Sequence, residues 1–346
     1  MSFEILKSIE KRGKAKGEPA YIEFIKKDKN PLAGTIKKRL ISSPNKAMYA
    51  INEMFYTLLR FKFKKSGVKF PFCTAVFPGS KPLKNVLKHT NAKNRYFYLI
   101  DIKDFYPSVK IHHVVQALNE LAPSYIKSDE LAEFLKKYCF DGSGRLRIGS
   151  PAAPDLANLT LAVFVDRKLA EICNAYHLTY TRYLDDLTFS AKRRFGKVKR
   201  EKIRRVIEES GFEISHKKTV IADIRKTPIM ITGIGIATDG RIFVRRGFLR
   251  KIIGLMHLIN SHQLQVQLSF NFAPKKKRAK DPVNIVKGLI SAFWATIPPR
   301  KGRPLNELEK KTMRDYLFFA EKYRGRRKRR TRMEKKMLAM LKDESV

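Results

Sequence analysis

Two adjacent aspartates, Asp185 and Asp186, lie between two short runs of β-branched and aromatic residues, Tyr180–Tyr183 and Leu187–Phe189. This pattern predicts a tight β-hairpin with the acidic pair at its turn. Neighbouring carboxylates repel each other, so a fold presents them together mainly where a cation neutralises them. Hard divalent ions such as Mg²⁺ take oxygen ligands and leave positions open for phosphates. The alternative is a solvated Asp-Asp turn, which the pair alone leaves open.

The acidic pair stands in a very basic chain. The 346 residues carry 73 Lys and Arg against 32 Asp and Glu, a formal net charge of +41. Such a charge destabilises the compact state by self-repulsion unless a polyanion neutralises it, so nucleic acid is the expected partner. With 43% hydrophobic residues, the chain is globular and long enough to bury a sizeable core.

A membrane surface is the competing partner for a basic chain. The sequence contains no run of about 18 apolar residues, and Met1–Glu10 is too polar for a signal peptide. Cys73, Cys139 and Cys173 are far apart and form no C-x-x-C, which fits a reduced compartment and argues against structural zinc. We therefore expect a cytoplasmic protein with no membrane partner.

The remaining pattern predicts an α+β fold. Helices are predicted at Met48–Phe63, Ile111–Leu121, Asp129–Tyr138, Pro154–Ile172, Lys197–Ser210, Phe248–Ile259 and Val283–Trp294. Strands are predicted at Tyr21–Lys27, Arg39–Ile41, Arg95–Ile102, Phe212–Ile214 and Ile229–Ile236, with a turn at Asp141–Gly144. This order places Asp101, at the end of one strand, beside the acidic hairpin at the edge of one antiparallel sheet.

Six segments, in order and spacing, resemble the motifs of reverse transcriptases of the bacterial retron type, over roughly residues 20–260. Four resemble general polymerase motifs: Leu99–Val109, Gly149–Asn158, Tyr183–Asp186 and Ile214–Thr219. Two resemble retron elements in particular. Asn85–His89 has the spacing of Asn-Ala-x-x-His, and Ile231–Gly233 is similar to Val-Thr-Gly.

The resemblance implies a right-hand polymerase with fingers, a palm built on an antiparallel sheet, and a thumb of helices. We expect residues 1–95 to form the N-terminal segment and part of the fingers. Residues 96–240 would form the palm with inserted fingers elements. Residues 241–346 would form the thumb and a basic C-terminal RNA-binding region.

The resemblance also implies two Mg²⁺ ions, with Mn²⁺ as a substitute, about 3.5–4 Å apart. Asp101 and Asp185 would bridge them, the carbonyl of Ile102 would be a further ligand, and Asp186 would be more peripheral. Lys218 would protonate the leaving pyrophosphate. The alternatives are three unrelated surface aspartates and a solvated lysine.

Four residues are expected to bind the incoming nucleotide. Arg39 would clamp the triphosphate, with a plain RNA contact as the alternative. Tyr106 would lie under the sugar and exclude a 2′-OH, with a core aromatic as the alternative. Gly149 and Ser150 belong to the loop that holds template and nucleotide in the family.

The sequence also departs from the family pattern. Ile148 stands where the family commonly has Gln before the motif glycine, and Leu184 replaces the Ala that retrons place before the acidic pair. Ser215 and Val86 replace the usual Asn and Ala. None of these changes removes a metal ligand, so we expect an active enzyme.

Further residues are expected to bind RNA. Asn85 and His89 are predicted to be structural or RNA-contacting. A metal site is not expected there, because no second histidine lies nearby. Two basic segments are expected to hold RNA phosphates: Lys275, Lys276, Lys277 and Arg278, and Arg326, Arg327, Arg329 and Arg330. A nuclear localisation signal is the alternative for the first segment, and a solvated charge run for the second.

The resemblance therefore predicts a bacterial, cytoplasmic retron reverse transcriptase. It would use dNTPs to make DNA (msDNA) on a structured non-coding RNA, primed from an internal guanosine 2′-OH, and would act with an effector protein in antiphage defence. One alternative is another bacterial defence-associated or group II intron-like reverse transcriptase. A second is a catalytically inactive RNA-binding scaffold that retains a polymerase palm.

Overall fold

The computed structural model describes residues 8, 11, 20–30, 35–76, 82–121, 128–261, 282–297, 305–323 and 329–342. The chain forms two compact units. Unit 1 comprises Met1–Ser80 and Asn94–Ala222, and unit 2 comprises Lys81–Lys93 and Asp223–Val346. The predicted division into fingers, palm and thumb at residues 95 and 240 stays a prediction.

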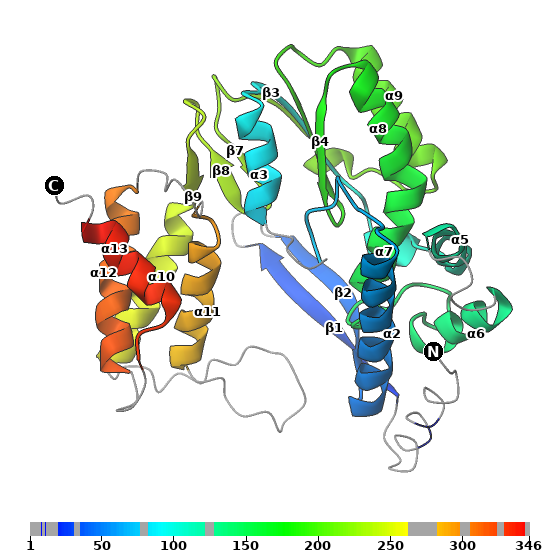
Figure 1. Cartoon of the computed structure of the whole chain (residues 1–346), viewed down its shortest axis with the longest axis horizontal. Coiled ribbons are helices and arrows are strands. Elements are labelled where there is room, and N and C mark those ends of the chain that lie inside the picture. Colours follow the sequence, from blue (N-terminus) through cyan, green and yellow to red (C-terminus); the bar gives the residue numbers. More distant parts are fainter. Residues whose placement is uncertain are drawn as a thin grey trace. The chain divides into compact units, whose positions relative to one another are not determined.

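Unit 1 contains a four-stranded sheet in the order β4-β5-β3-β6, of which β3 and β4 are labelled in Figure 1. Its strands are β3 (Tyr96–Asp101), β4 (Thr179–Tyr183), β5 (Asp186–Ala191) and β6 (Val220–Asp223). β5 is antiparallel to both β3 and β4, so the predicted α+β fold and the predicted acidic hairpin are confirmed. The register aligns Asp101 with Asp186.

Helices surround this sheet and share one apolar core with it. They are α2 (Lys46–Lys65), α4 (Phe105–Ser108), α5 (Ile111–Leu121), α6 (Ser128–Tyr138), α7 (Ala153–Leu161), α8 (Arg167–Ala175) and α9 (Lys197–Glu209). Ile51, Phe134 and Leu187 are wholly buried in this core. The helices predicted from apolar spacing in this unit are present, with bounds that differ by a few residues.

One predicted helix contains an irregularity. The segment predicted as a continuous helix over Pro154–Ile172 is built from α7, a π-helical turn at Ala162–Asp166, and α8. A π turn closes i→i+5 hydrogen bonds and so holds one more residue than an α turn. The extra residue changes which side chains face the sheet after residue 161, and it brings Asp166 into contact with β4.

A long antiparallel hairpin precedes α2. Its strands are β1 (Tyr21–Asn30) and β2 (Thr35–Pro44), which are longer than predicted. Its apolar side chains Ile22, Ile25, Ile36 and Leu40 are exposed. A backbone hydrogen bond joins the hairpin to the loop before Gly149: the N–H of Ser42 donates to the carbonyl of Ile148 at 2.8 Å.

Two predicted strands were wrong in form. Phe212–Ile214 contributes only an isolated bridge, between Ile214 and Ile102, because the chain turns away after one pair. The predicted strand Ile229–Ile236 is instead the hairpin of β7 (Ile229–Ile231) and β8 (Ile234–Ile236). Its two turn residues, Thr232 and Gly233, have φ of +47° and +86°, as a two-residue hairpin turn requires.

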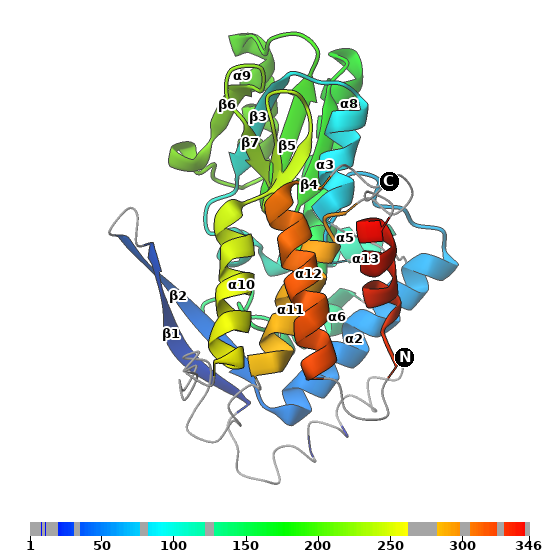
Figure 2. The same ribbon diagram turned by 90° about the vertical axis from the view of Figure 1, so that its left-hand side faces the viewer.

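Unit 2 has its own core. β7, β8 and β9 (Ile242–Val244) form a three-stranded sheet, and α3 (Pro82–Asn91) packs against β7 and β8. The helices α10 (Arg246–Asn260), α11 (Pro282–Trp294), α12 (Glu307–Lys322) and α13 (Arg332–Lys342) follow. α11 and α12 both pack on α10, as Figure 2 shows, and they bury Leu249, Ile290 and Phe319.

The helices predicted at Phe248–Ile259 and Val283–Trp294 are therefore confirmed as α10 and α11. The basic residues Lys275, Lys276, Lys277, Arg278, Arg326 and Arg327 lie outside the described residues. Among the residues that the structure does describe, no helix combines the length and the apolar character needed to cross a bilayer.

Candidate active site

Three aspartates meet where β3 ends and the β4–β5 hairpin turns. Asp101 is the last residue of β3 and the register partner of Asp186, the first residue of β5. Leu184 adopts a left-handed conformation with φ of +57° and so makes the turn. The N–H of Ile102 donates to the carbonyl of Asp185 at 3.1 Å, which binds the hairpin turn to the end of β3.

A second segment is bound to the other side of β3. The N–H of Ser215 donates to the carbonyl of Asp101 at 2.8 Å. This contact places the short 3-10 turn His216–Lys218 beside the aspartates. Lys218 Nζ lies 2.6 Å from Oδ1 of Asp101, and the Lys218 side chain is 52% exposed.

The carboxylates are close enough to affect one another's protonation. Burial, together with the charges of Asp185 and Asp101, raises the pKa of Asp186 from 3.8 to about 6, although Lys218 acts in the opposite direction. The ionised form of Asp186 therefore loses hydration on burial and is repelled by two neighbouring carboxylates, which Lys218 only partly offsets.

The donor set fits a hard divalent cation. Its oxygens come from Asp101, Asp185 and Asp186, and burial together with the charges of the two other aspartates raises the pKa of Asp186. Lys218 already places one positive charge on Asp101. Within the residues that the structure describes, no three His, Cys, Asp or Glu side chains enclose a metal position as they stand. The metal assignment therefore rests on donor chemistry.

A cavity of about 380 Å³ lies beside the hairpin turn. It is formed by β2, the segment from Ile102 to α4, the loop before Gly149, the hairpin turn and the turn that bears Lys218. Asp185, Ile102, Tyr106, Arg39 and Lys218, all predicted site residues, line it. Three further cations that the sequence reasoning missed also line it: Lys38, Arg145 and Arg147. The alternation of Arg145 and Arg147 beside the predicted turn was the available signal.

Arg147 joins the wall of this cavity to the β1–β2 hairpin. Its Nη1 donates to Glu23 at 2.6 Å, and its guanidinium lies 4.3 Å from the centroid of the Tyr21 ring. Its Nε donates to the carbonyl of Phe140 at 3.0 Å. Arg145 is held by Asp141 at 2.9 Å. Arg147 is therefore held by three contacts at the rim of the cavity, whereas the Arg145 side chain is 46% exposed.

Tyr106 is partly buried in the cavity wall. Its ring packs against that of Phe105, with 5.4 Å between centroids, in the short helix α4. Burial, then the charge of Asp185, raises the pKa of Tyr106 to about 12, so its hydroxyl stays neutral at ordinary pH. An aromatic ring beside Asp185 agrees in position with the predicted role, which stays a prediction.

Gly149 and Ser150 do not line the described part of the cavity. Gly149 has φ of +112°, and a Cβ there would lie 2.6 Å from the carbonyl oxygen of Ser42. Ser150 is buried, and its hydroxyl donates to Oδ1 of Asn52 at 2.7 Å. Both residues hold the loop against β2 and α2, whereas Ile148 faces the cavity. Nucleotide contact by the two stays a prediction.

The predicted RNA-binding residues lie in different settings. Asn85 and His89 are wholly buried on α3, which packs against β7 and β8, and this supports the structural alternative. Burial, then the charge of Lys88, lowers the pKa of His89 to about 3, so it is neutral. Arg329 and Arg330 are exposed, and Arg330 lies 3.2 Å from a carboxylate oxygen of Glu321.

The arrangement can be compared with known proteins. The sequence profile of the family described as "Reverse transcriptase (RNA-dependent DNA polymerase)" matches residues 25–236. Retron Ec73 reverse transcriptase of Escherichia coli is 34% identical over 180 residues, which cover 49% of this chain and 56% of that protein. Retron Mx65 reverse transcriptase of Myxococcus xanthus is 30% identical over 217 residues, which cover 58% and 48%. The chain thus spans about half the length of these relatives.

The fold is also found among solved structures. The structure of apo telomerase from Candida tropicalis superposes with a TM-score of 0.50 and 11% identity, over 93% of this chain and 64% of that chain. At this identity the likeness concerns the fold alone. It agrees with the predicted right-hand polymerase architecture.

Proposed function

Because this chain belongs to the reverse transcriptase family, we propose that it is an RNA-directed DNA polymerase of the retron type. The observation that carries the proposal is the meeting of Asp101 and Asp186 in register, with Asp185 facing a cavity lined by cations. A carboxylate cluster beside a cationic cavity suits a substrate that brings both metal ions and a triphosphate.

The metal ions would be Mg²⁺, with Mn²⁺ as a substitute. Asp101 and Asp185 would hold them, with the carbonyl of Ile102 as a further ligand and Asp186 at the edge of the cluster. Bound there, the ions would supply charge stabilisation for the attacking and leaving oxygens of a phosphoryl transfer.

The remaining residues of the cavity have complementary roles. Arg39, Lys38 and Arg145 would bind the triphosphate oxygens, because guanidinium and ammonium groups donate to phosphate. Once the Lys218 ammonium has separated from Asp101, it would give a proton to the leaving pyrophosphate. Tyr106 would occupy the space that a ribose 2′-OH needs and so favour dNTPs.

The template is proposed to be a structured non-coding RNA made with the protein. The names of the curated relatives support this setting, since they are retron reverse transcriptases. In it, an internal guanosine 2′-OH would prime DNA synthesis and an effector protein would join the complex in antiphage defence, in the bacterial cytoplasm. The two basic segments, Lys275–Arg278 and Arg326–Arg330, would bind RNA phosphates.

Activity is tested with the protein purified together with its RNA, in Mg²⁺ and labelled dNTPs. Incorporation should need RNA and be abolished by EDTA. The variant Asp185→Ala with Asp186→Ala should lose incorporation. Asp239→Ala, at an exposed turn aspartate paired with Arg241, is the matched control and should keep it.

The outcomes separate the alternatives. Incorporation that persists in the double aspartate variant would remove the proposed metal site. Failure of the wild-type protein to extend any primer would favour the inactive RNA-binding scaffold. DNA joined to RNA through a 2′ branch supports the retron reading, whereas extension from ordinary 3′ ends alone favours another kind of bacterial reverse transcriptase.

A further inference from the structure

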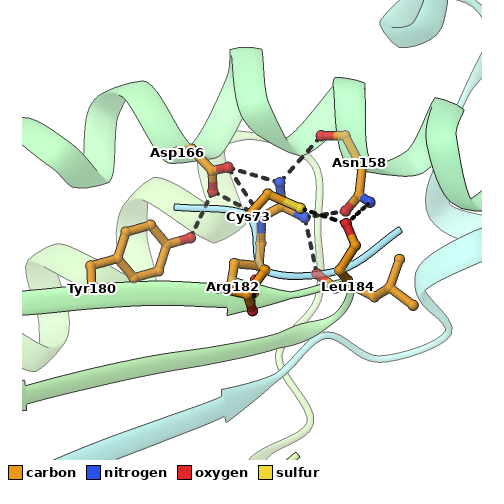
Figure 3. A network of polar contacts seen from close by, with 8 residues as sticks. Cys73, Asn158, Asp166, Tyr180, Arg182 and Leu184 are labelled. Atoms are coloured by element: carbon orange, nitrogen blue, oxygen red, sulfur yellow. Dashed lines mark hydrogen bonds and ion pairs between the residues drawn. The ribbon is translucent and has the colours of Figure 1, made fainter. Parts of the chain in front are cut away.

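A fully buried arginine lies directly behind the acidic turn. Arg182 is the fourth of the five residues of β4, two residues before Leu184, and its side chain has 0% exposure. Figure 3 shows that its guanidinium reaches three partners: Asp166, Asn158 and the carbonyl of Leu184. All three guanidinium nitrogens donate hydrogen bonds, so the group has a single orientation.

The ion pair with Asp166 is the main anchor of this guanidinium. Arg182 Nε donates to Oδ1 at 2.9 Å, and Nη2 donates to Oδ2 at 2.8 Å, a forked contact that fits the planar guanidinium. Burial lowers the pKa of Arg182, but the charge and hydrogen bonds of Asp166 outweigh burial and raise it, so the guanidinium stays charged. Asp166 also accepts from the hydroxyl of Tyr180 at 2.7 Å.

The helix that faces β4 supplies both anchors. Asp166 is the last residue of the π turn, and Asn158 lies in α7. Arg182 Nη1 donates to Oδ1 of Asn158 at 2.7 Å, and Nη2 donates to its backbone carbonyl at 3.2 Å. Because the π turn adds one residue between the two anchors, it decides whether Asp166 can reach the guanidinium.

The backbone of Arg182 is fixed as well. Its N–H donates to the carbonyl of Phe72 at 2.8 Å. Its own carbonyl accepts from the N–H of Thr74 at 2.8 Å and from the Thr74 hydroxyl at 3.0 Å. Arg182 is therefore held at the main chain and at the side chain, and it presents Nη1 as a rigid donor.

That donor reaches the turn. Nη1 of Arg182 lies 3.2 Å from the carbonyl oxygen of Leu184, the residue with φ of +57°. The carbonyl of Leu184 and the N–H of Asp185 belong to one planar peptide, so the contact sets the plane that precedes Asp185. The plane that follows Asp185 is set by Ile102, whose N–H donates to the Asp185 carbonyl.

We propose that Arg182, held by Asp166, is the positioning residue for Asp185. The two peptides that flank Asp185 are clamped, one by Arg182 and one by Ile102, and the direction of its carboxylate follows from the two planes. A left-handed leucine is uncommon and costs conformational energy, so the turn needs such support to persist. The proposal rests on the proposed function, in which Asp185 binds metal.

Stability alone does not account for this arrangement. Replacing a buried ion pair by apolar residues of similar size is often neutral or stabilising, because charges lose their hydration on burial. Apolar residues at positions 182 and 166 would fill the same space but would offer no donor to the Leu184 carbonyl. The role of the pair is therefore separable from its contribution to folding.

The test uses the whole protein with its RNA and the variant Arg182→Met combined with Asp166→Leu. This variant removes both buried charges and leaves neither unpaired, so we expect it to fold, with a lower thermal midpoint because the Tyr180 hydroxyl and the Asn158 oxygens lose their partners. We expect kcat for dNTP incorporation to fall about 10- to 100-fold, with the KM for the RNA template unchanged. Mn²⁺ affinity, measured without nucleotide by the paramagnetic resonance of the free ion, should fall by a similar factor.

Tyr180→Phe is the matched control, because it removes one hydrogen bond to Asp166 and leaves the Arg182–Leu184 contact intact. It should keep wild-type kcat and Mn²⁺ affinity. A folded double variant with wild-type kcat and wild-type Mn²⁺ affinity would overturn the proposal.

If the double variant does not fold, Arg182→Lys decides the matter. Lysine retains the positive charge opposite Asp166, but its single ammonium group cannot pair with Asp166 and also donate to the Leu184 carbonyl in the geometry of the guanidinium. Weaker Mn²⁺ binding by this folded variant supports positioning, and unchanged binding contradicts it. If wild-type protein incorporates no dNTP, the proposed function fails while the Mn²⁺ comparison still tests the clamp.

Discussion

Lys218 and Asp101 are 117 residues apart in sequence, yet the lysine Nζ lies 2.6 Å from a carboxylate oxygen of the aspartate. The two residues meet because the segment around Ser215 is hydrogen-bonded to the end of β3. In the proposed metal site, the lysine would therefore compete with a metal ion for one of the two carboxylate oxygens of Asp101.

The first prediction concerns this competition. Lys218→Ala should bind Mn²⁺ more tightly in the absence of nucleotide, because one competitor for Asp101 is removed. The lysine is half exposed, so the gain should be modest, about two- to fivefold. The measurement is a Mn²⁺ titration of the folded protein. Lys217→Ala, at the exposed neighbouring lysine, is the control, and equal affinities for the two variants would contradict competition.

The second prediction concerns Gly149. Alanine there would place a Cβ 2.6 Å from the Ser42 carbonyl oxygen, so β2 and its cavity residues must move. The alanine would also have to adopt the unfavourable positive φ of Gly149. We expect Gly149→Ala to raise the KM for dNTPs about tenfold. Gly144→Ala is the control, because Gly144 also has a positive φ, +68°, but a Cβ there meets nothing within 4 Å. A similar rise in the KM for dNTPs in both variants would mean that the strain of a positive φ, and not the contact with Ser42, causes the effect.

The third prediction concerns Tyr106. Its ring lies in the wall of the cavity beside Asp185. Tyr106→Val should open space for a 2′-OH and increase the use of ribonucleotides relative to deoxynucleotides at least about tenfold. The ratio of kcat/KM for the two substrates measures this, and Tyr49→Val, at an exposed tyrosine, should leave it unchanged. An unchanged ratio in the Tyr106 variant would mean that the sugar lies elsewhere.

The fourth prediction is a pH dependence of stability from His89. Its folded pKa is lowered to about 3, against 6.5 for an exposed histidine, so unfolding takes up a proton below pH 6.5. The stabilisation is present above pH 6.5 and is lost as the pH falls toward 3. At pH 5 the free energy of unfolding should have fallen by about 2 kcal/mol, which corresponds to a decrease of about 4–8 °C in the thermal midpoint.

Scanning calorimetry of the wild-type protein and His89→Gln at pH 7 and pH 5 checks this. Between pH 7 and pH 5, the thermal midpoint of the variant should fall by less than that of the wild type, whatever the variant's stability at pH 7. His257→Gln, at an exposed histidine of the same unit, should behave as wild type. Parallel losses in the wild type and the His89 variant would rule the linkage out.

Much of the palm was predictable because its signals are local. The alternating runs on either side of Asp185 specified the hairpin, and the apolar run before Asp101 specified β3. Antiparallel pairing then brought the aspartates together. The predicted strand at Ile229–Ile236 failed because Thr232 gave no sign of a turn, since β-branched residues rarely adopt positive φ.

What escaped prediction depends on contacts between distant segments. Arg182 looked like one polar residue of a hairpin, and nothing in its neighbourhood indicated a buried partner on the preceding helix. The π turn that brings Asp166 into reach has no apolar periodicity of its own. Lys38 lies about a hundred residues before Arg145 and Arg147 in the sequence, and the three cations share a site only through the fold.

The position of α3 has a consequence for synthesis on the ribosome. This helix is made before most of unit 1, but it packs on β7 and β8, which are made more than a hundred residues later. At ordinary translation rates the delay is on the order of ten seconds. Throughout that interval the apolar face of α3, with Leu83 and Val86, lacks its final cover, which makes it a natural target for chaperones during translation.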